Sequence, residues 1–222
     1  MKKLWLFVLA FSLSLNTVFA INYDNYKLRV LDQVNSPKDI KKLSNAKLNA
    51  LADDIRFAIV KRANTYGGHL GSDLAVVEAT IAMHYVFDSP KDKIVFDVSH
   101  QCYPHKILTG RKNGFLDPKM YFVVSGYTNP AESKHDIFAV GHTSTGISLA
   151  TGLAKGRDVS GKDGNVVVLV GDGALSGGEA YEGLNNAAVL GSNIIIVVND
   201  NEMSIAETHG GLYKNLALLN QE

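Results

Sequence analysis

The stretch that decides the fold opens with VVVLVGDG at residues 166–173 and closes with IIIVVNDN at residues 194–201. Each half is an apolar, largely β-branched run that ends in a polar triplet, Gly171-Asp172-Gly173 or Asn199-Asp200-Asn201. Strands that are apolar on both faces are typical of a buried parallel sheet. With a helix predicted between them, over residues 178–190, the pattern predicts an α/β fold, a doubly wound parallel sheet with helices on both faces.

The flanking sequence extends this alternation. Ser44 is a plausible N-cap for a helix whose apolar residues recur every three or four positions. A second helix is expected from Ser72 or Asp73 to about Phe87, and a third from Ser144 to Lys155. Short apolar runs predict strands at residues 94–98 and 137–140, and residues 110–130 are expected to form a surface loop.

The two polar triplets carry the chemistry. Neighbouring parallel strands would bring both triplets to the carboxyl edge of the sheet, where such folds bind ligands. Mg²⁺ prefers carboxylate and carbonyl oxygens, and takes its remaining ligands from phosphate and water. The glycines would let backbone N–H groups approach a phosphate closely near a helix N-terminus. The pair of triplets therefore favours a magnesium-diphosphate site over two ordinary turns.

Longer blocks of the sequence resemble those of one enzyme family. The triplets look like the thiamine-diphosphate motif, and residues 67–70 (GGHL), 96–111 (FDVSHQCYPHKILTGR), 141–145 (GHTST) and 199–205 (NDNEMSI) are similar to blocks of the 1-deoxy-D-xylulose-5-phosphate synthases. These synthases are thiamine-diphosphate enzymes of the transketolase-like superfamily. The resemblance covers roughly residues 30–218, the N-terminal part of a synthase.

The resemblance implies roles for individual residues. Asp172, Asn201 and the backbone carbonyl of Met203 would hold Mg²⁺. Thiamine diphosphate would contact His100, Gly141, His142, Thr143, Gly173, Ala174 and Asn201. His69 and His100 would be the catalytic groups, with His69 near the reactive carbon of the cofactor as a proton-transfer or substrate-orienting group.

Some residues depart from the usual wording of the family or allow a second interpretation. Thr143 replaces the usual serine, Ser99 the usual glycine and Cys102 the usual alanine, and Asp73 is also unusual. His84 is expected to be structural because it lies on an apolar helix face. His105 and Lys106 fit a substrate-phosphate site and a structural helix start equally well.

The resemblance also implies a function. A full synthase condenses pyruvate with D-glyceraldehyde 3-phosphate, with loss of CO₂, in isoprenoid and thiamine precursor synthesis. A second module, in cis or in trans, would bind the cofactor's pyrimidine and supply an activating glutamate. We therefore expect residues 21–222 to be an incomplete diphosphate-binding domain, inactive alone and part of a homodimer in the full-length family. The alternatives are a non-catalytic truncated homologue and the N-terminal subunit of a split transketolase.

Composition limits partners and location. Lys+Arg and Asp+Glu both number 22, so no basic footprint for nucleic acid or a membrane surface is expected. The single cysteine excludes an intrachain disulfide. Residues 1–20 resemble a secretory signal peptide or an apolar extension, with Lys2 and Lys3 before an apolar run, and are set aside for the fold. The family resemblance implies a cytoplasmic enzyme, whereas residues 1–20 suggest export.

Overall fold

The computed structural model describes residues 5–10, 25–200, 210, 211 and 218. The chain divides into two compact units. The first contains Met1–Ser12, Asp92–Val98 and Val140–Glu222, and the second contains Leu13–Lys91 and Ser99–Ala139. Each unit is described on its own below.

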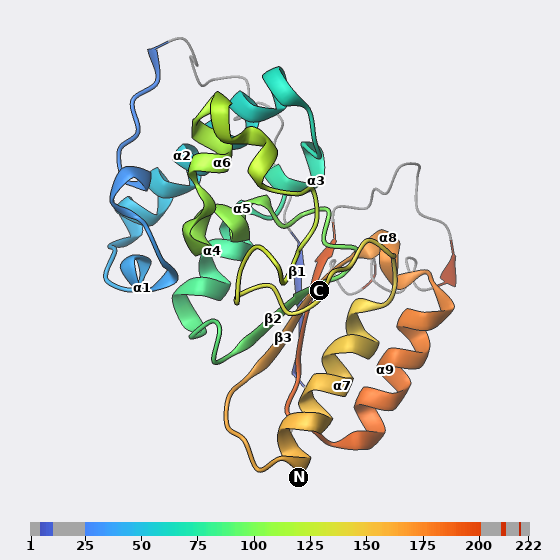
Figure 1. Cartoon of the computed structure of the whole chain (residues 1–222). Coiled ribbons are helices and arrows are strands. Elements are labelled where there is room, and N and C mark those ends of the chain that lie inside the picture. Colours follow the sequence, from blue (N-terminus) through green and yellow to red (C-terminus); the bar gives the residue numbers. More distant parts are fainter. Residues whose placement is uncertain (1–4, 11–24, 201–209, 212–217, 219–222) are drawn as a thin grey trace. The chain divides into compact units, whose positions relative to one another are not determined.

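The first unit is built on a parallel sheet (Figure 1). Its strands are β2 (Lys93–Phe96), β3 (Val166–Gly171), β4 (Ile195–Asp200) and β1 (Trp5–Ala10), in the spatial order β1-β4-β3-β2. All three pairings are parallel. The α/β class and the parallel sheet predicted from the apolar runs are therefore confirmed.

Two long helices accompany this sheet. Helix α7 (Gly146–Val159) packs on β2 and β3, and α9 (Gly178–Leu190) packs against α7. The short helix α8 (Asp172–Leu175) joins the end of β3 to α9. Helix α9 has the predicted bounds, because Gly191 follows it in the left-handed conformation (φ 60°) that commonly ends helices.

Strand β1 lies within residues 1–20, the segment that resembles a signal peptide. It pairs with β4 in parallel, from Trp5 opposite Ile195 to Ala10 opposite Asp200. The apolar run is thus compatible with an outer strand of the sheet, which sequence reasoning did not foresee. The signal-peptide interpretation of residues 1–20 stays a prediction.

The second unit is helical. Its elements are η3 (Leu31–Gln33), α1 (Pro37–Ile40), α2 (Asn45–Tyr66), α3 (Gly71–Leu74), α4 (Val77–Val86), α5 (Tyr103–Lys106), η4 (Ile107–Arg111), α6 (Asn113–Leu116) and η5 (Pro118–Val123). Helix α2 follows Ser44 as predicted, and its residues Leu51, Ile55 and Ile59 are almost completely buried.

Two predictions in this region were wrong. Residues 110–130 are not a plain loop, because they contain α6 and η5, with Phe115 and Tyr121 in the core. Residues 137–140 form no strand. The segment from 124 to 140 has no regular secondary structure, so its backbone groups must find other partners.

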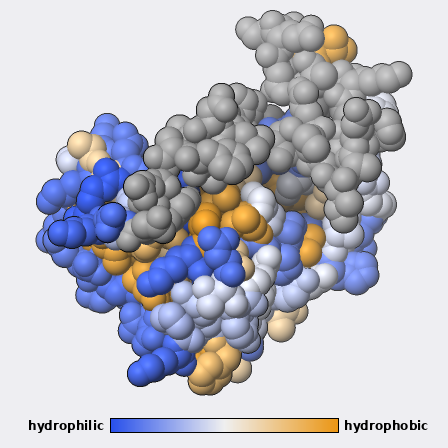
Figure 2. All heavy atoms as spheres, turned by 90° about the horizontal axis from the view of Figure 1, so that it is seen from above, coloured by the Kyte–Doolittle hydropathy of each residue, from blue (hydrophilic) through white to orange (hydrophobic). Residues whose placement is uncertain are grey.

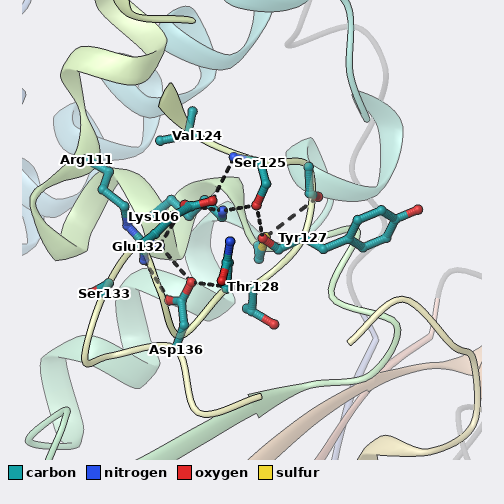
Figure 3. A network of polar contacts seen from close by, with 12 residues as sticks. Lys106, Arg111, Val124, Ser125, Tyr127, Thr128, Glu132, Ser133 and Asp136 are labelled. Carbon is teal, nitrogen blue, oxygen red and sulfur yellow. Dashed lines mark hydrogen bonds and ion pairs between the residues drawn. The ribbon is translucent and has the colours of Figure 1, made fainter. Parts of the chain in front are cut away.

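Buried charges supply those partners (Figure 3). The Lys106 ammonium is completely buried and donates to Glu132 (2.7 Å) and to the Ser125 hydroxyl (3.1 Å). Arg111 donates to both carboxylate oxygens of Asp136 (2.7 Å each). The same carboxylates accept the backbone N–H groups of Ser125 (2.9 Å) and Asn129 (2.7 Å). In residues 125–136, charged side chains thus satisfy backbone N–H groups that in a strand would be paired with a neighbouring strand.

A chain of histidines extends this network inward. His105 Nε2 lies 3.0 Å from Asp136, and His105 Nδ1 lies 2.8 Å from His84 Nε2. The carboxylate accepts a hydrogen bond from the Nε2–H of His105, so His105 Nδ1 accepts a hydrogen bond in turn from the Nε2–H of His84. Burial lowers the pKa of both imidazoles, which keeps them neutral. His84, His105 and Lys106 are all completely buried, so the structural interpretation of these three residues is the one the fold supports.

The visible surface is mostly hydrophilic, with hydrophobic residues in small patches (Figure 2). Among the described residues, Val86, Phe122, Val159 and Val189 are the most exposed large apolar side chains of the two units, together with Leu218 and Tyr66. The described helices include none with the length and apolar character that a membrane span requires.

The network gives a stability prediction. Asp136→Asn removes a buried carboxylate that holds Arg111, His105 and the Asn129 N–H, so we expect a loss of about 3–5 kcal/mol in the free energy of unfolding. Chemical denaturation measures this loss. The control is Asp88→Asn, which removes an exposed ion pair to Lys41 and should leave the midpoint close to wild type. Equal midpoints for the two variants would show that the network does not stabilise the fold.

Candidate functional site: the carboxyl edge of the sheet and a histidine pair

The register of the sheet brings the two polar triplets together. Gly171 at the end of β3 lies opposite Asn199 in β4, so Asp172 and Asp200 follow at the same level of the sheet. This is the arrangement that the spacing predicted. The side-chain oxygen of Asn199 is buried and has no hydrogen-bond partner among the described residues. Apart from its two neighbours in the chain, no described residue has an atom within 4 Å of a Cβ atom placed on Gly171.

The electrostatics of the edge favour a cation. Asp172 and Asp200 are both buried, at 3% and 6% exposure. Burial, opposed by the Gly173 N–H and reinforced by the charge of Asp200, raises the pKa of Asp172 to about 6. Two buried carboxyl groups side by side do not ionise readily together, and a bound cation would relieve this repulsion.

The predicted ligands Asn201 and Met203 lie outside the described residues. Within the described part of the chain, no group of three or more His, Cys, Asp or Glu side chains could hold a metal ion. Mg²⁺ takes few of its ligands from protein carboxylates and the rest from other oxygen donors.

The loop at residues 141–145 meets the turn after β3. Gly141, His142 and Thr143 are exposed, and His142 Nδ1 donates to the Thr143 carbonyl (3.2 Å). The buried Ser144 donates its hydroxyl to the Ala174 carbonyl (2.8 Å). The loop therefore lies against the Gly173-Ala174 turn, and the structure brings these predicted cofactor contacts together.

Asp97 holds this loop in place, and sequence reasoning missed its role. Its two carboxylate oxygens accept the backbone N–H groups of Ser144 (2.9 Å) and Gly146 (2.7 Å). Burial raises the pKa of Asp97, and the two N–H groups oppose that rise. Ser144 has a left-handed backbone (φ 71°), which a residue other than glycine adopts only when its surroundings hold it there. An aspartate after a buried strand was a usable signal, as at Asp172.

The two predicted catalytic histidines lie together in the second unit. The rings of His69 and His100 are 5.8 Å apart and nearly perpendicular. Both rings have a buried Nδ1 without a hydrogen-bond partner among the described residues. Burial lowers the pKa of both imidazoles, so each is neutral near pH 7 and able to accept a proton.

Gly68 and Tyr103 fix the position of His69. The backbone N–H of His69 donates to the Tyr103 hydroxyl (3.4 Å). A Cβ atom on Gly68 would lie 2.5 Å from that hydroxyl, and Gly68 has φ 129°, so only glycine fits. The Gly67-Gly68-His69 block thus has a steric reason for its second glycine.

Three of the unusual residues, Asp73, Ser99 and Cys102, lie in the second unit. Asp73 is completely buried, and its Oδ1 accepts the Tyr103 N–H (2.7 Å). The Cys102 thiol lies 3.9 Å from the Gly126 carbonyl, and burial raises its pKa well above the ordinary value, which disfavours the thiolate form. Ser99 has φ 67°, which explains why glycine is the usual residue at its position.

Comparison with known proteins gives consistent results. The family model described as 1-deoxy-D-xylulose-5-phosphate synthase matches residues 31–222. The chain is similar to "1-deoxy-D-xylulose-5-phosphate synthase 2" of Geobacter sulfurreducens, with 51% identity over 83% of this chain and 29% of the relative. It is also similar to the 1-deoxy-D-xylulose-5-phosphate synthase of Caldanaerobacter subterraneus, with 48% identity over 86% of this chain and 30% of the relative. The chain therefore spans less than a third of the length of these relatives.

The Asp97 contacts can be tested directly. Asp97→Asn keeps one acceptor oxygen but sets an amide N–H against a backbone N–H, so we expect a loss of about 1.5–3 kcal/mol in unfolding free energy. Denaturant titration measures the loss, with the exposed Asp163→Asn as control. Hydrogen exchange at Ser144 and Gly146 should rise in the Asp97 variant alone. Unchanged exchange at both amides would mean that the carboxylate does not hold the loop.

Proposed function

The chain belongs to the 1-deoxy-D-xylulose-5-phosphate synthase family, and from this premise we propose that it forms the diphosphate- and magnesium-binding part of such an enzyme. The enzyme would be a transketolase-type transferase that joins pyruvate to D-glyceraldehyde 3-phosphate with loss of CO₂. The observation that carries the proposal is the register of β3 and β4, which sets Asp172 beside Asp200 at the carboxyl edge of the sheet.

The residues at this edge fit the cofactor. The Asp172 carboxylate would hold Mg²⁺, together with Asn201 and the Met203 carbonyl. The backbone of Gly173 and Ala174 at the start of α8 would contact the diphosphate, and Gly141, His142 and Thr143 would line the rest of the pocket. The surroundings of Gly171 and Gly141 support this, since no described residue apart from their chain neighbours lies within 4 Å of a Cβ atom placed on either glycine. Thiamine diphosphate, when bound, supplies a nucleophilic carbon and an electron sink.

The histidine pair would handle protons and substrate. His69 and His100 are neutral near pH 7 because burial lowers the pKa of both imidazoles. A neutral imidazole can accept a proton or a hydrogen bond from a substrate hydroxyl group through its unprotonated nitrogen. We assign His69 to proton transfer or substrate orientation, and His100 to contact with both cofactor and substrate.

The proposal has further parts that rest on the family. A pyrimidine-binding module with an activating glutamate would complete the site, in cis or in trans, and the assembled enzyme would be a homodimer. The sheet would be doubly wound, with helices on both faces. The enzyme would work in the cytoplasm, where sugar phosphates are made.

Magnesium binding should depend on Asp172 and on pH. Because Mg²⁺ needs the ionised carboxylate and the pKa of Asp172 is about 6, affinity should be constant well above pH 6 and fall by up to about tenfold per pH unit below it. Titration calorimetry with Mg²⁺ and thiamine diphosphate between pH 5 and 8 measures this. Asp172→Ala should abolish binding, whereas Asp163→Ala should not. Equal binding by wild type and Asp172→Ala would refute the metal site.

The reaction gives the second test. Release of labelled CO₂ from pyruvate, with glyceraldehyde 3-phosphate present, is measured for the chain alone and with a polypeptide that carries the pyrimidine-binding module. We expect 1-deoxy-D-xylulose 5-phosphate when the module is present, and a rate lower by about 10²–10⁴ for His69→Ala, the range for a lost acid–base group. A full rate in His69→Ala would remove this histidine from the mechanism. Absence of product under all conditions would favour the non-catalytic alternative.

A further inference from the structure

One short loop forms the wall beside His69. We call residues 125–128 the Gly126 loop. A Cβ atom on Gly126 would lie 3.4 Å from the His69 ring, and the Tyr127 ring lies 5.1 Å from that ring in an edge-on arrangement. The Gly126 carbonyl raises the pKa of His69, against the larger effect of burial. The loop therefore sets both the exposure and the polar surroundings of this imidazole.

The charged network holds the loop only at its flanks. Lys106 and Glu132 bind Ser125, before Gly126, and Asp136 binds the N–H of Asn129, after Thr128 (Figure 3). Between these points the Ser125 hydroxyl donates to the Tyr127 carbonyl (2.9 Å), which closes the loop on itself. None of these contacts fixes how near Gly126 and Tyr127 come to His69.

Ser99 adds a contact inside the loop, beside the one from the Cys102 thiol to the Gly126 carbonyl (3.9 Å). Its hydroxyl oxygen accepts the backbone N–H of Thr128 at 3.1 Å, and both residues are buried. The Thr128 hydroxyl donates to the Phe138 carbonyl (2.8 Å), which anchors the same residue on its other side. Ser99 lies directly before His100, so this hydrogen bond ties the Gly126 loop to the backbone that carries the second histidine.

The backbone conformation of Ser99 indicates that its hydroxyl group has a structural role. At φ 67° a serine is strained relative to glycine, which adopts the left-handed region freely. A strained residue persists where its surroundings hold it. The hydrogen bond to Thr128 is an interaction that glycine could not make.

We propose that Ser99 is a positioning residue, which holds the Gly126 loop against His69 and thereby sets the exposure and proton affinity of that imidazole. The proposal rests on the proposed role of His69, but its test does not use activity. The groups that face His69 are His100, Tyr103, Tyr127 and, from α2, Arg62.

The test is nuclear magnetic resonance of the full chain, with His69 titrated through its ring Cε1–H signal. Ser99→Gly removes the hydroxyl and relieves the strained backbone. We expect the Thr128 amide to lose about tenfold in hydrogen-exchange protection, as for one lost buried hydrogen bond. The contacts between the Tyr127 and His69 rings should weaken, and the pKa of His69 should move up toward its ordinary value of about 6.5, because burial is the largest cause of its depression.

Ser99→Ala separates positioning from simple stability. It also lacks the hydroxyl but keeps the strained φ, so it should be less stable than Ser99→Gly while showing the same shift at His69. Ser160→Gly, which removes an exposed serine hydroxyl at the end of α7, should change neither. An unchanged His69 titration in Ser99→Gly would overturn the proposal, even if its stability changed. Loss of activity in His69→Ala is a separate result, so failure of the catalytic role and failure of the positioning role can be distinguished.

Discussion

The second unit depends on the rule that a buried charge needs a partner. Lys106 is completely buried and Arg111 nearly so, and a buried cation without a counter-charge costs several kcal/mol. Glu132 and Asp136 meet this need only if residues 125–136 fold back over α5 and η4. Once they do, their carboxylates also satisfy the N–H groups of Ser125 and Asn129. These contacts fix the backbone conformation of a segment that has no regular secondary structure. The segment can therefore hold Gly126 and Tyr127 beside His69.

The first unit follows a different constraint, the register of parallel strands. Because Gly171 pairs with Asn199, Asp172 and Asp200 both lie at the carboxyl edge of the sheet. Their mutual repulsion is a cost to the fold, and a cation bound at the proposed site would offset it. Asp97 acts in the same region by accepting two N–H groups from the loop at residues 141–146. Both units thus use carboxylates to position backbone.

Sequence reasoning was accurate where periodicity decides structure. The apolar runs at β3 and β4 and the helix between them were found because β-branched runs and a terminal Gly191 are local signals. Prediction from the sequence failed where contacts between residues far apart in the chain determine the local structure. Residues 137–140 look like a strand but form none. The segment before them is held through Glu132 and Asp136 by Lys106 and Arg111. The roles assigned to His69 and His100 rest on family resemblance, whereas the contact between Ser99 and Thr128 follows from no sequence spacing.

The pairing of β1 with β4 has a consequence for the order of events during synthesis. Trp5 meets Ile195, so the first apolar strand is made long before its partner exists. At about 5–20 residues per second, the intervening chain takes roughly 10–40 s to emerge from a ribosome. Throughout that interval the segment is available to any machinery that recognises a nascent apolar stretch. Whether residues 5–10 pair with β4 would then depend on whether other machinery binds them first, because the pairing can form only after residue 200 has been translated.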